Sequence, residues 1–181
     1  MEHTRLHLYD FDGTLFRSPE PPPGWDQESW YGDPASLSAP CVPTFPPATW
    51  WITSTVQSAK RAISDPNVYT VMATGRQEHP FKNRLEELLQ AAHLDFDEMH
   101  LRPHGRTADF KVRLVRQVLD DHPSITRVDL WEDQERNMAM YRVAIQGMGV
   151  SCKVHPVKFK PMPAWCRRPS PARVASMWVR R

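Results

Sequence analysis

The 181-residue sequence has no hydrophobic run long enough to cross a membrane. A membrane-spanning helix needs about 20 consecutive apolar residues, and no apolar stretch of the chain approaches that length. The first residues lead into a short apolar stretch that ends at Asp10, which is not the pattern of a secretory signal peptide. The chain also lacks the G-x-x-x-x-G-K-[ST] phosphate loop, which excludes a kinase of the P-loop class.

Cysteine is scarce, with three residues in the whole chain. Cys41, Cys152 and Cys166 are odd in number and widely spaced, so they indicate neither a disulfide framework nor a zinc site. This pattern is typical of a reducing compartment. Together with the missing membrane and secretion signals, it predicts a cytoplasmic protein.

Acidic residues are absent from the last part of the chain. After Asn137 there are nine Lys or Arg residues and no Asp or Glu, whereas residues 1–137 hold 14 basic and 21 acidic residues. The net charge of +2 therefore hides an acidic body and a basic end. This split excludes a uniformly basic nucleic-acid coat protein. The basic end is either a solvated terminus or a surface that attracts phosphate backbones.

Proline, in contrast, is abundant, with 18 residues in the chain, about twice the usual frequency. Half of the prolines lie between Pro19 and Pro47, where helix and central strand are both disfavoured. Disordered segments are poor in aromatic residues, so the tryptophans of this region argue against disorder. They are Trp25, Trp30, Trp50 and Trp51. We predict an ordered but irregular insert over about 18–51.

Outside the insert, short apolar runs alternate with amphipathic stretches. The apolar runs predict strands over 5–9, 68–73, 99–101, 125–131 and 150–157. The amphipathic stretches predict helices from about 53 to a stop at 65–67, and over 81–92, 107–121 and 134–146, with Thr107 as an N-cap. This alternation predicts an α/β domain with a mainly parallel sheet. We place one domain at 1–157 and a basic, Pro- and Arg-rich tail at 158–181.

Acidic and hydroxyl side chains follow several of the predicted strands. Asp10 and Asp12 follow the first strand, Thr74 follows the second, and Glu132 and Asp133 follow a later one. Because ligands bind at the carboxyl ends of parallel strands, we expect these side chains to gather at one site.

Asp10 and Asp12 are two carboxylates separated by one residue in a tight turn. Their charges repel, and a hard divalent cation such as Mg²⁺ relieves the repulsion while it binds a substrate phosphate. One carboxylate can attack phosphorus, and the other can protonate the leaving oxygen and then activate water. Gly13 would let the backbone approach the phosphate, and Lys111 could neutralise its charge. The spacing therefore indicates phosphoryl chemistry.

These residues resemble the motifs of the haloacid dehalogenase (HAD) superfamily of phosphohydrolases. Residues 8–16 resemble its first motif, a hydrophobic strand followed by D-x-D-G-T. Residues 71–76 match the strand that ends in Thr or Ser, Lys111 matches the lysine, and 128–133 match the strand that ends in acidic residues. The resemblance covers about Arg5 to Val157. It implies a HAD-like three-layer Rossmannoid sandwich in which the insert forms a small cap or flap.

A narrower resemblance is to the HAD domain of the "Swiss Army Knife" RNA-repair proteins, a domain inferred to be a phosphatase of RNA ends. It rests on a series of short segments in the same order: 73–76, Phe81, 88–89, 94–97, 101–103, 107–111 and 131–133. A small cap in HAD proteins goes with an open site and a bulky substrate, which favours a polynucleotide or phosphoprotein end over a free sugar phosphate.

The resemblance implies a role for each matching position. Asp10 resembles the nucleophile and Asp12 the general acid/base, while Thr74, Gly75 and Lys111 resemble the phosphate-binding residues. The implied metal is Mg²⁺, and its implied ligands are Asp10, the main-chain carbonyl of Asp12, and Asp133 with Glu132 beside it. Many HAD proteins have a further acid at the position of Asn137. Asn137 would act through a water, or the pair Glu132–Asp133 would suffice.

Two features leave alternatives open. Arg76 either pairs with a carboxylate or contacts the phosphate. The insert residues Trp25, Trp30 and Trp50 either pack locally or stack on bases.

The sequence thus predicts a Mg²⁺-dependent phosphomonoesterase that works through an aspartyl-phosphate, with an RNA or DNA end as its substrate and no membrane partner. One alternative is a phosphatase of nucleotides or other small molecules. Another is a nucleic-acid-binding module with a vestigial HAD core.

Overall fold

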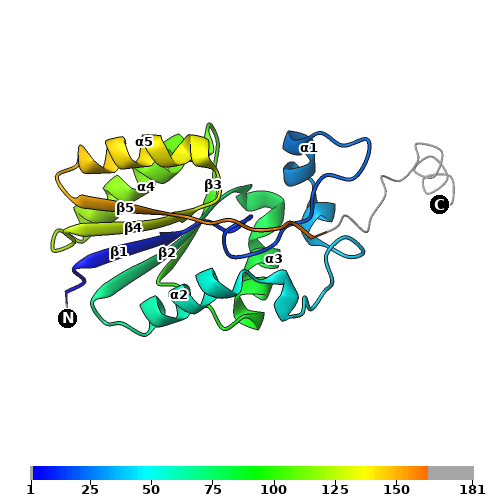
Figure 1. The fold of residues 1–181 in the computed structure, drawn as a ribbon, viewed down its shortest axis with the longest axis horizontal. Helices are drawn as coiled ribbons and strands as arrows, with labels where there is room; N and C mark the ends of the chain where they lie inside the picture. The colour runs from blue at the N-terminus through cyan, green and yellow to red at the C-terminus, as the bar shows by residue number, and fades with distance from the viewer. Residues whose placement is uncertain (1, 163–181) are drawn as a thin grey trace, which may run out of the picture.

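A computed structural model describes residues 2–162. Its five strands form one parallel sheet in the order β3-β2-β1-β4-β5 (Figure 1). They are β1 (Arg5–Tyr9), β2 (Val68–Gln77), β3 (Glu98–Arg102), β4 (Arg127–Glu132) and β5 (Ser151–Pro156). Most residues of the central strands β1, β2 and β4 are buried or half-buried, as expected for a sheet covered on both faces.

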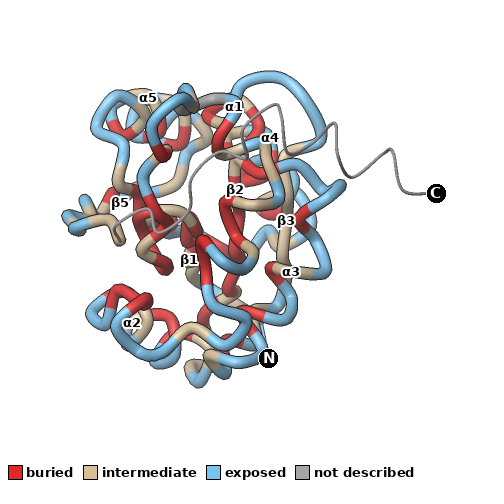
Figure 2. Tube along the Cα trace, turned by 90° about the vertical axis from the view of Figure 1, so that its right-hand side faces the viewer, coloured by how far each residue is buried: buried red, intermediate tan, exposed pale blue. Residues whose placement is uncertain are grey.

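Helices cover both faces of the sheet, so the molecule has three layers (Figure 1). Helices α2 (Thr53–Ile63) and α3 (Glu78–Ala91) share one hydrophobic core with Tyr9 and Met72. Helices α4 (Thr107–Asp121) and α5 (Glu135–Gln146) share the other core with Leu8 and Val71. The buried segments lie between these layers in Figure 2. The α/β fold with a parallel sheet is confirmed.

The predicted N-cap at Thr107 was wrong. Thr107 is the first residue of α4, and Arg106 stands at the N-cap without a capping side-chain hydrogen bond. The Thr107 side chain lies instead against Gly75, where a Cβ would come 2.6 Å from the Thr107 hydroxyl oxygen. The Thr107 side chain therefore packs against the carboxyl-terminal part of β2 and does not cap α4.

The insert contains more regular structure than predicted. It holds a short helix α1 (Gln27–Gly32) and two 3₁₀ turns, η1 (Pro34–Leu37) and η2 (Ala48–Trp50). Helix α1 forms in a proline-free window, and Asp26 caps it by accepting a hydrogen bond from the Ser29 N–H at 2.8 Å. The expectation that no helix forms in this region was therefore wrong.

Two insert tryptophans pack inside the protein. Trp30 is 1% exposed and donates its ring N–H to the Pro19 carbonyl at 2.9 Å. Trp50 is also buried and stacks near Phe16. Trp25 is half-buried and packs against Trp30. Local packing therefore accounts for Trp30 and Trp50, whose rings are not available to a base.

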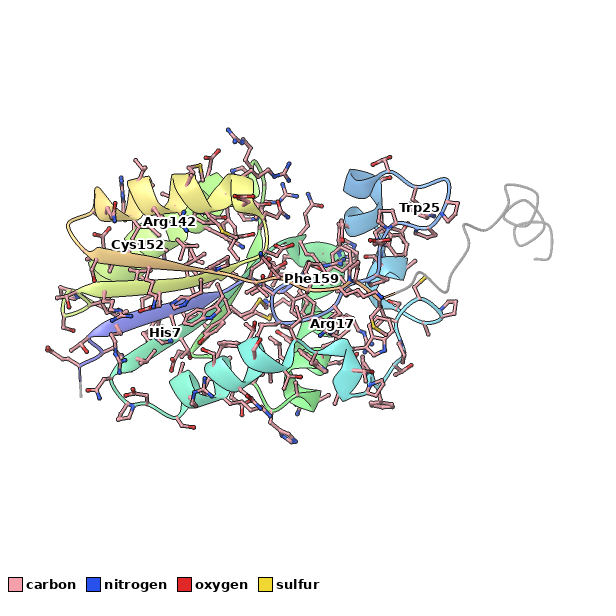
Figure 3. The ribbon with its side chains drawn as sticks, viewed as in Figure 1. His7, Arg17, Trp25, Arg142, Cys152 and Phe159 are labelled. Atoms are coloured by element: carbon pink, nitrogen blue, oxygen red, sulfur yellow. The ribbon has the colours of Figure 1, made fainter. Side chains whose placement is uncertain are left out.

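The chain after β5 continues past the end of the sheet and lies against the loop that follows β1 (Figure 1). The Phe159 ring lies against Gly13, the Lys160 carbonyl accepts a hydrogen bond from Arg17 at 3.1 Å, and Met162 packs on the core. Figure 3 shows Arg17 and Phe159 at this end of the sheet. Thus 158–162, predicted as the start of the tail, contact the domain.

Residues 163–181 lie outside the described part of the chain. The prediction for the basic end concerns mostly these residues. The prediction from the cysteine pattern does not hold at Cys41, which is disulfide-bonded. Among residues 2–162, Cys152 is a free thiol. No helix of this part is both long and apolar enough to cross a membrane.

Candidate active site

Three carboxylates meet at the carboxyl ends of β1 and β4. Asp10, Glu132 and Asp133 each offer an oxygen atom, and these atoms lie within 4.8 Å of one another. The neighbouring strands set this geometry, because Tyr9 pairs with Trp131 and the Asp10 N–H donates to the Trp131 carbonyl at 3.2 Å. Asp10 and Glu132 are 122 positions apart in the chain. They nevertheless lie at the same edge of the sheet, as predicted from their positions at the ends of strands.

Lys111 of α4 reaches into this cluster. Its ammonium group lies 2.8 Å from Asp10 Oδ1 and 3.1 Å from Glu132 Oε2, and all three side chains are buried. Burial alone would lower the pKa of Lys111, but the negative charges of Asp10 and Glu132 outweigh it and raise that pKa. Lys111 therefore stays protonated.

The carboxylates are held in an unfavourable environment for their charges. Burial raises the pKa of Asp10 to about 7, and Glu132 adds to the rise while Lys111 opposes it. Burial raises the pKa of Asp133 to about 8, with further contributions from Asp10 and Glu132. Crowded carboxylates and one ammonium leave a negative centre that a cation would stabilise.

Asp133 shows that the cluster fits a hard cation. Its Oδ1 is buried and has no hydrogen-bond partner among the described residues. Such an oxygen is costly unless something satisfies it. Carboxylate oxygens are the ligands that Mg²⁺ prefers. Asp10, Glu132 and Asp133 together provide that kind of donor set.

Asp12 is not part of this carboxylate cluster and binds Arg76 instead. Its Oδ1 accepts a hydrogen bond from Arg76 Nη2 at 2.8 Å, and its Oδ2 accepts one from Arg76 Nε at 3.0 Å. The Ser18 hydroxyl donates to the same carboxylate. Arg76 is 3% exposed and also donates to Ser36 Oγ at 2.6 Å and to the Tyr31 carbonyl. Arg76 therefore joins Asp12 to the insert.

The other predicted residues surround this centre. Thr74 is fully buried at the end of β2, and its hydroxyl oxygen accepts the Arg76 N–H at 3.2 Å. Gly75 is packed tightly against Thr107. Asn137, in the first turn of α5, donates to the Gln134 side chain at 3.4 Å, and among the described contacts it has none to the acidic cluster.

Gly13 lies between Asp12 and the acidic cluster. Its φ is +68°, a left-handed conformation that favours glycine. A Cβ there would come within 2.5 Å of both Asp133 Oδ2 and the Phe159 ring. Phe159 and the insert residues Ser18 and Ser36 were missed by the sequence reasoning. Neither spacing nor periodicity marks them, since they reach the site only through the tertiary fold.

The fold and this acidic centre define a protein of the HAD-like class. The chain belongs to HAD domain family 1 of the Swiss Army Knife RNA repair proteins, whose family model matches residues 15–164. The predicted family is therefore confirmed. The match begins at Leu15, just after the loop that carries Asp10, Asp12 and Gly13.

The chain is similar in sequence to a yeast protein and similar in fold to two solved structures. The uncharacterized protein YMR265C of Saccharomyces cerevisiae is 27% identical, over 72% of this chain and 34% of the yeast protein. The chain thus spans about a third of that relative's length. A chain in the structure of the Pnkp1/Rnl/Hen1 RNA repair complex is similar in fold, with a TM-score of 0.57 and 14% identity, over 87% of this chain and 44% of that one. A second structure of the Pnkp1/Rnl/Hen1 complex gives the same TM-score at 16% identity, over 87% of this chain and 48% of that one.

Proposed function

We propose that the protein is a Mg²⁺-dependent phosphomonoesterase that works through an aspartyl-phosphate. The observation that carries the proposal is the buried group of Asp10, Glu132 and Asp133 around Lys111 at the carboxyl ends of β1 and β4. The metal would be held by Asp10, Asp133 and the main-chain carbonyl of Asp12, with Glu132 beside it. Bound there, it would offset the negative charge of the phosphoryl group.

In the first step, an Asp10 oxygen attacks phosphorus and the bond to the leaving oxygen breaks. Asp12 gives its proton to that oxygen, so that an alcohol leaves. In the second step, a water attacks the phosphoryl group and passes a proton to the Asp12 carboxylate. The bond to Asp10 then breaks, and inorganic phosphate is released. Thr74, Gly75 and Lys111 would bind the phosphoryl oxygens through both steps.

The Asp10→Asn variant tests this mechanism. We expect kcat for an aryl phosphate to fall at least about a thousandfold, because the nucleophile is lost. Wild-type activity should vanish with EDTA and return with Mg²⁺. Asp95→Asn, an exposed carboxylate in a loop, is the matched control and should retain wild-type kcat. Full activity of Asp10→Asn would exclude the mechanism.

We further propose that the substrate is a polynucleotide end. The family takes its name from RNA repair proteins, and a similar fold occurs in an RNA repair complex. The comparison to make is turnover of a 3′-phosphorylated oligonucleotide, a 5′-phosphorylated one and the corresponding mononucleotides. A higher kcat/KM for the mononucleotides would favour a small-molecule phosphatase. RNA binding without phosphate release from any substrate would favour a vestigial core.

A further inference from the structure

A row of three stacked rings crosses the sheet next to the acidic cluster. Tyr9, Trp131 and His155 lie on β1, β4 and β5, and the register pairs Tyr9 with Trp131 and Trp131 with His155. Tyr9 and Trp131 stack with ring centroids 4.3 Å apart, and Trp131 and His155 stack at 4.2 Å with 6° between the planes. Because β5 is an edge strand, the row ends at the edge of the sheet.

The terminal ring is held firmly but is not enclosed. His155 Nε2 lies 2.6 Å from Asp129 Oδ1, and Arg127 Nε lies 2.6 Å from Asp129 Oδ2. The His155 side chain is 26% exposed. One of its faces stacks on Trp131, and no other ring within residues 2–162 stacks on it.

A cavity of about 280 Å³ opens beside this ring. That size is close to the lower limit of small-ligand pockets, about 300 Å³. Trp131 and His155 line it with aromatic side chains. Ser54, an exposed hydroxyl residue at the start of α2, and the exposed Lys158 also line it. The lining thus combines a flat aromatic surface, a hydrogen-bonding group and a positive charge.

The cavity and the acidic cluster both lie at the carboxyl end of β4. Trp131 lines the cavity, and Glu132 and Asp133 of the cluster follow it directly in the chain. The segment that follows β5 borders both places, because Pro156 and Val157 line the cavity while Phe159 contacts Gly13 beside Asp133. A phosphate at the cluster and a ring in the cavity could therefore belong to one substrate.

We infer that this cavity binds the terminal nucleobase of a single-stranded polynucleotide, which stacks on His155. This inference rests on the proposed function and names the part of the substrate that lies next to the scissile phosphate. Stacking on an aromatic side chain is tolerant of sequence, so the site takes any base. Lys158 faces the sugar–phosphate backbone, and the Ser54 hydroxyl offers a hydrogen bond to the base or ribose.

A binding assay tests the inference without catalysis. The full chain is titrated with an unphosphorylated single-stranded oligonucleotide that carries 2-aminopurine at its 3′ end, and the quenching of 2-aminopurine reports stacking. We expect His155→Ala to weaken binding about tenfold and to abolish most of the quenching. His155→Phe keeps the ring and should bind within about twofold of wild type. Lys153→Ala, an exposed residue of the same strand, is the matched control.

Several outcomes would overturn the inference. Wild-type binding by His155→Ala would exclude stacking, and an equal loss in His155→Phe would show a structural role through Asp129. If His155→Ala does not fold, as judged by circular dichroism, Ser54→Trp replaces it. Ser54 is exposed, so a bulky ring there should fill the cavity and block binding without disturbing the core. Equal affinity for 2-aminopurine riboside monophosphate would exclude a polynucleotide as the specific ligand.

The assay also separates this inference from the proposed function. Phosphate release from aryl phosphates with no quenching of the oligonucleotide would overturn the base site and leave the phosphatase in place. Quenching that depends on His155, with no phosphate release from any substrate, would overturn the phosphatase and leave the base site in place. If both hold, His155→Ala should lower kcat/KM for a phosphorylated oligonucleotide several-fold more than for an aryl phosphate.

Discussion

Gly13 leaves little room for a side chain in the loop that carries Asp10 and Asp12. It combines a left-handed backbone with close contacts to Asp133 and Phe159. A methyl group there would push Asp133 away from Asp10 and Glu132. The acidic centre therefore depends on a residue that carries no functional group.

We expect Gly13→Ala to lower kcat for an aryl phosphate at least about a hundredfold, because a 1 Å displacement in an active site has effects of this order. The matched control is Gly149→Ala. Gly149 also has a positive φ, +82°, but a Cβ there meets nothing within 4 Å. Both variants should lose about 1 kcal/mol of stability from backbone strain. Gly13→Ala should lose more because of its close contacts, and only Gly13→Ala should lose activity. Equal activity of the two variants would contradict the expectation.

Protonation of His7 should make the stability of the protein depend on pH. Burial lowers the pKa of His7 to about 4, although Asp129 opposes the shift. The unfolded chain takes up a proton near pH 6.5 and the folded chain does not. Stability should therefore fall as the pH drops from about 6.5 to about 4, and this group should add no further change below that range.

Urea unfolding at pH 7 and pH 5 measures the effect. Between these values, we expect the wild type to lose about 2 kcal/mol more than His7→Gln, which cannot be protonated. His93→Gln, an exposed histidine, should behave like the wild type. An identical pH response of His7→Gln and the wild type would show that His7 does not contribute.

At the scale of elements, Arg76 links the end of β2 to the insert. The same guanidinium binds the Asp12 carboxylate, Ser36 and the Tyr31 carbonyl, and it lies over the Phe81 ring at 4.6 Å. Arg76 was predicted either to pair with a carboxylate or to contact phosphate, and in the structure it pairs with Asp12. The insert is therefore tied directly to the proposed acid/base.

Arg76→Lys keeps the charge but loses the forked geometry. We expect kcat to fall at least about tenfold, because Asp12 loses its second hydrogen bond. Arg84→Lys is the comparison, since Arg84 binds the Leu37, Pro43 and Thr44 carbonyls of the insert. Limited proteolysis should show a loosened insert in both variants, with a smaller effect on kcat for Arg84→Lys. A larger loss of kcat in Arg84→Lys would mean that anchoring of the insert matters more than the Asp12 contact.

The helices and strands also show which parts of the fold and of the site can be predicted from the sequence. Periodicity and strand-end positions identified the sheet and the convergence of Asp10 with Glu132 and Asp133, because parallel neighbours bring their carboxyl ends together. The Arg76–Asp12 pair joins residues 64 positions apart, and no local pattern selects that partner among the other acids. Helix α1 was missed because proline abundance was averaged over the whole segment, while Asp26 and a proline-free window decided the local structure.

For the molecule as a whole, the acidic centre lowers the stability of the metal-free fold. Burial and like charges raise the pKa of Asp133 to about 8, so ionising it in the folded, metal-free protein is unfavourable. A cation would reverse this by supplying the missing partner. We therefore expect the metal-free protein to be less stable than the protein with a cation bound at the acidic centre.

Thermal unfolding at pH 8 with and without Mg²⁺ tests this expectation. We expect Mg²⁺ to raise the Tm of the wild type by several degrees, since a ligand at 100 times its Kd adds about 2.7 kcal/mol. Asp133→Asn should have a metal-free Tm at least as high as that of the wild type and should lose the response to Mg²⁺. Asp95→Asn should keep the response. A response to Mg²⁺ that survives in Asp133→Asn would place the cation elsewhere.

The contacts of the segment after β5 determine where a truncation can remove the basic end without disturbing the domain. Phe159, Lys160 and Met162 lie beyond the last strand, yet they contact Gly13, Arg17 and the core. A chain that ends at Pro156 would lose the Phe159 ring that lies against Gly13 together with the basic end. Any loss of RNA binding would then have two causes. A truncation meant to examine the basic end alone has to start after Met162, although the last strand ends six residues earlier.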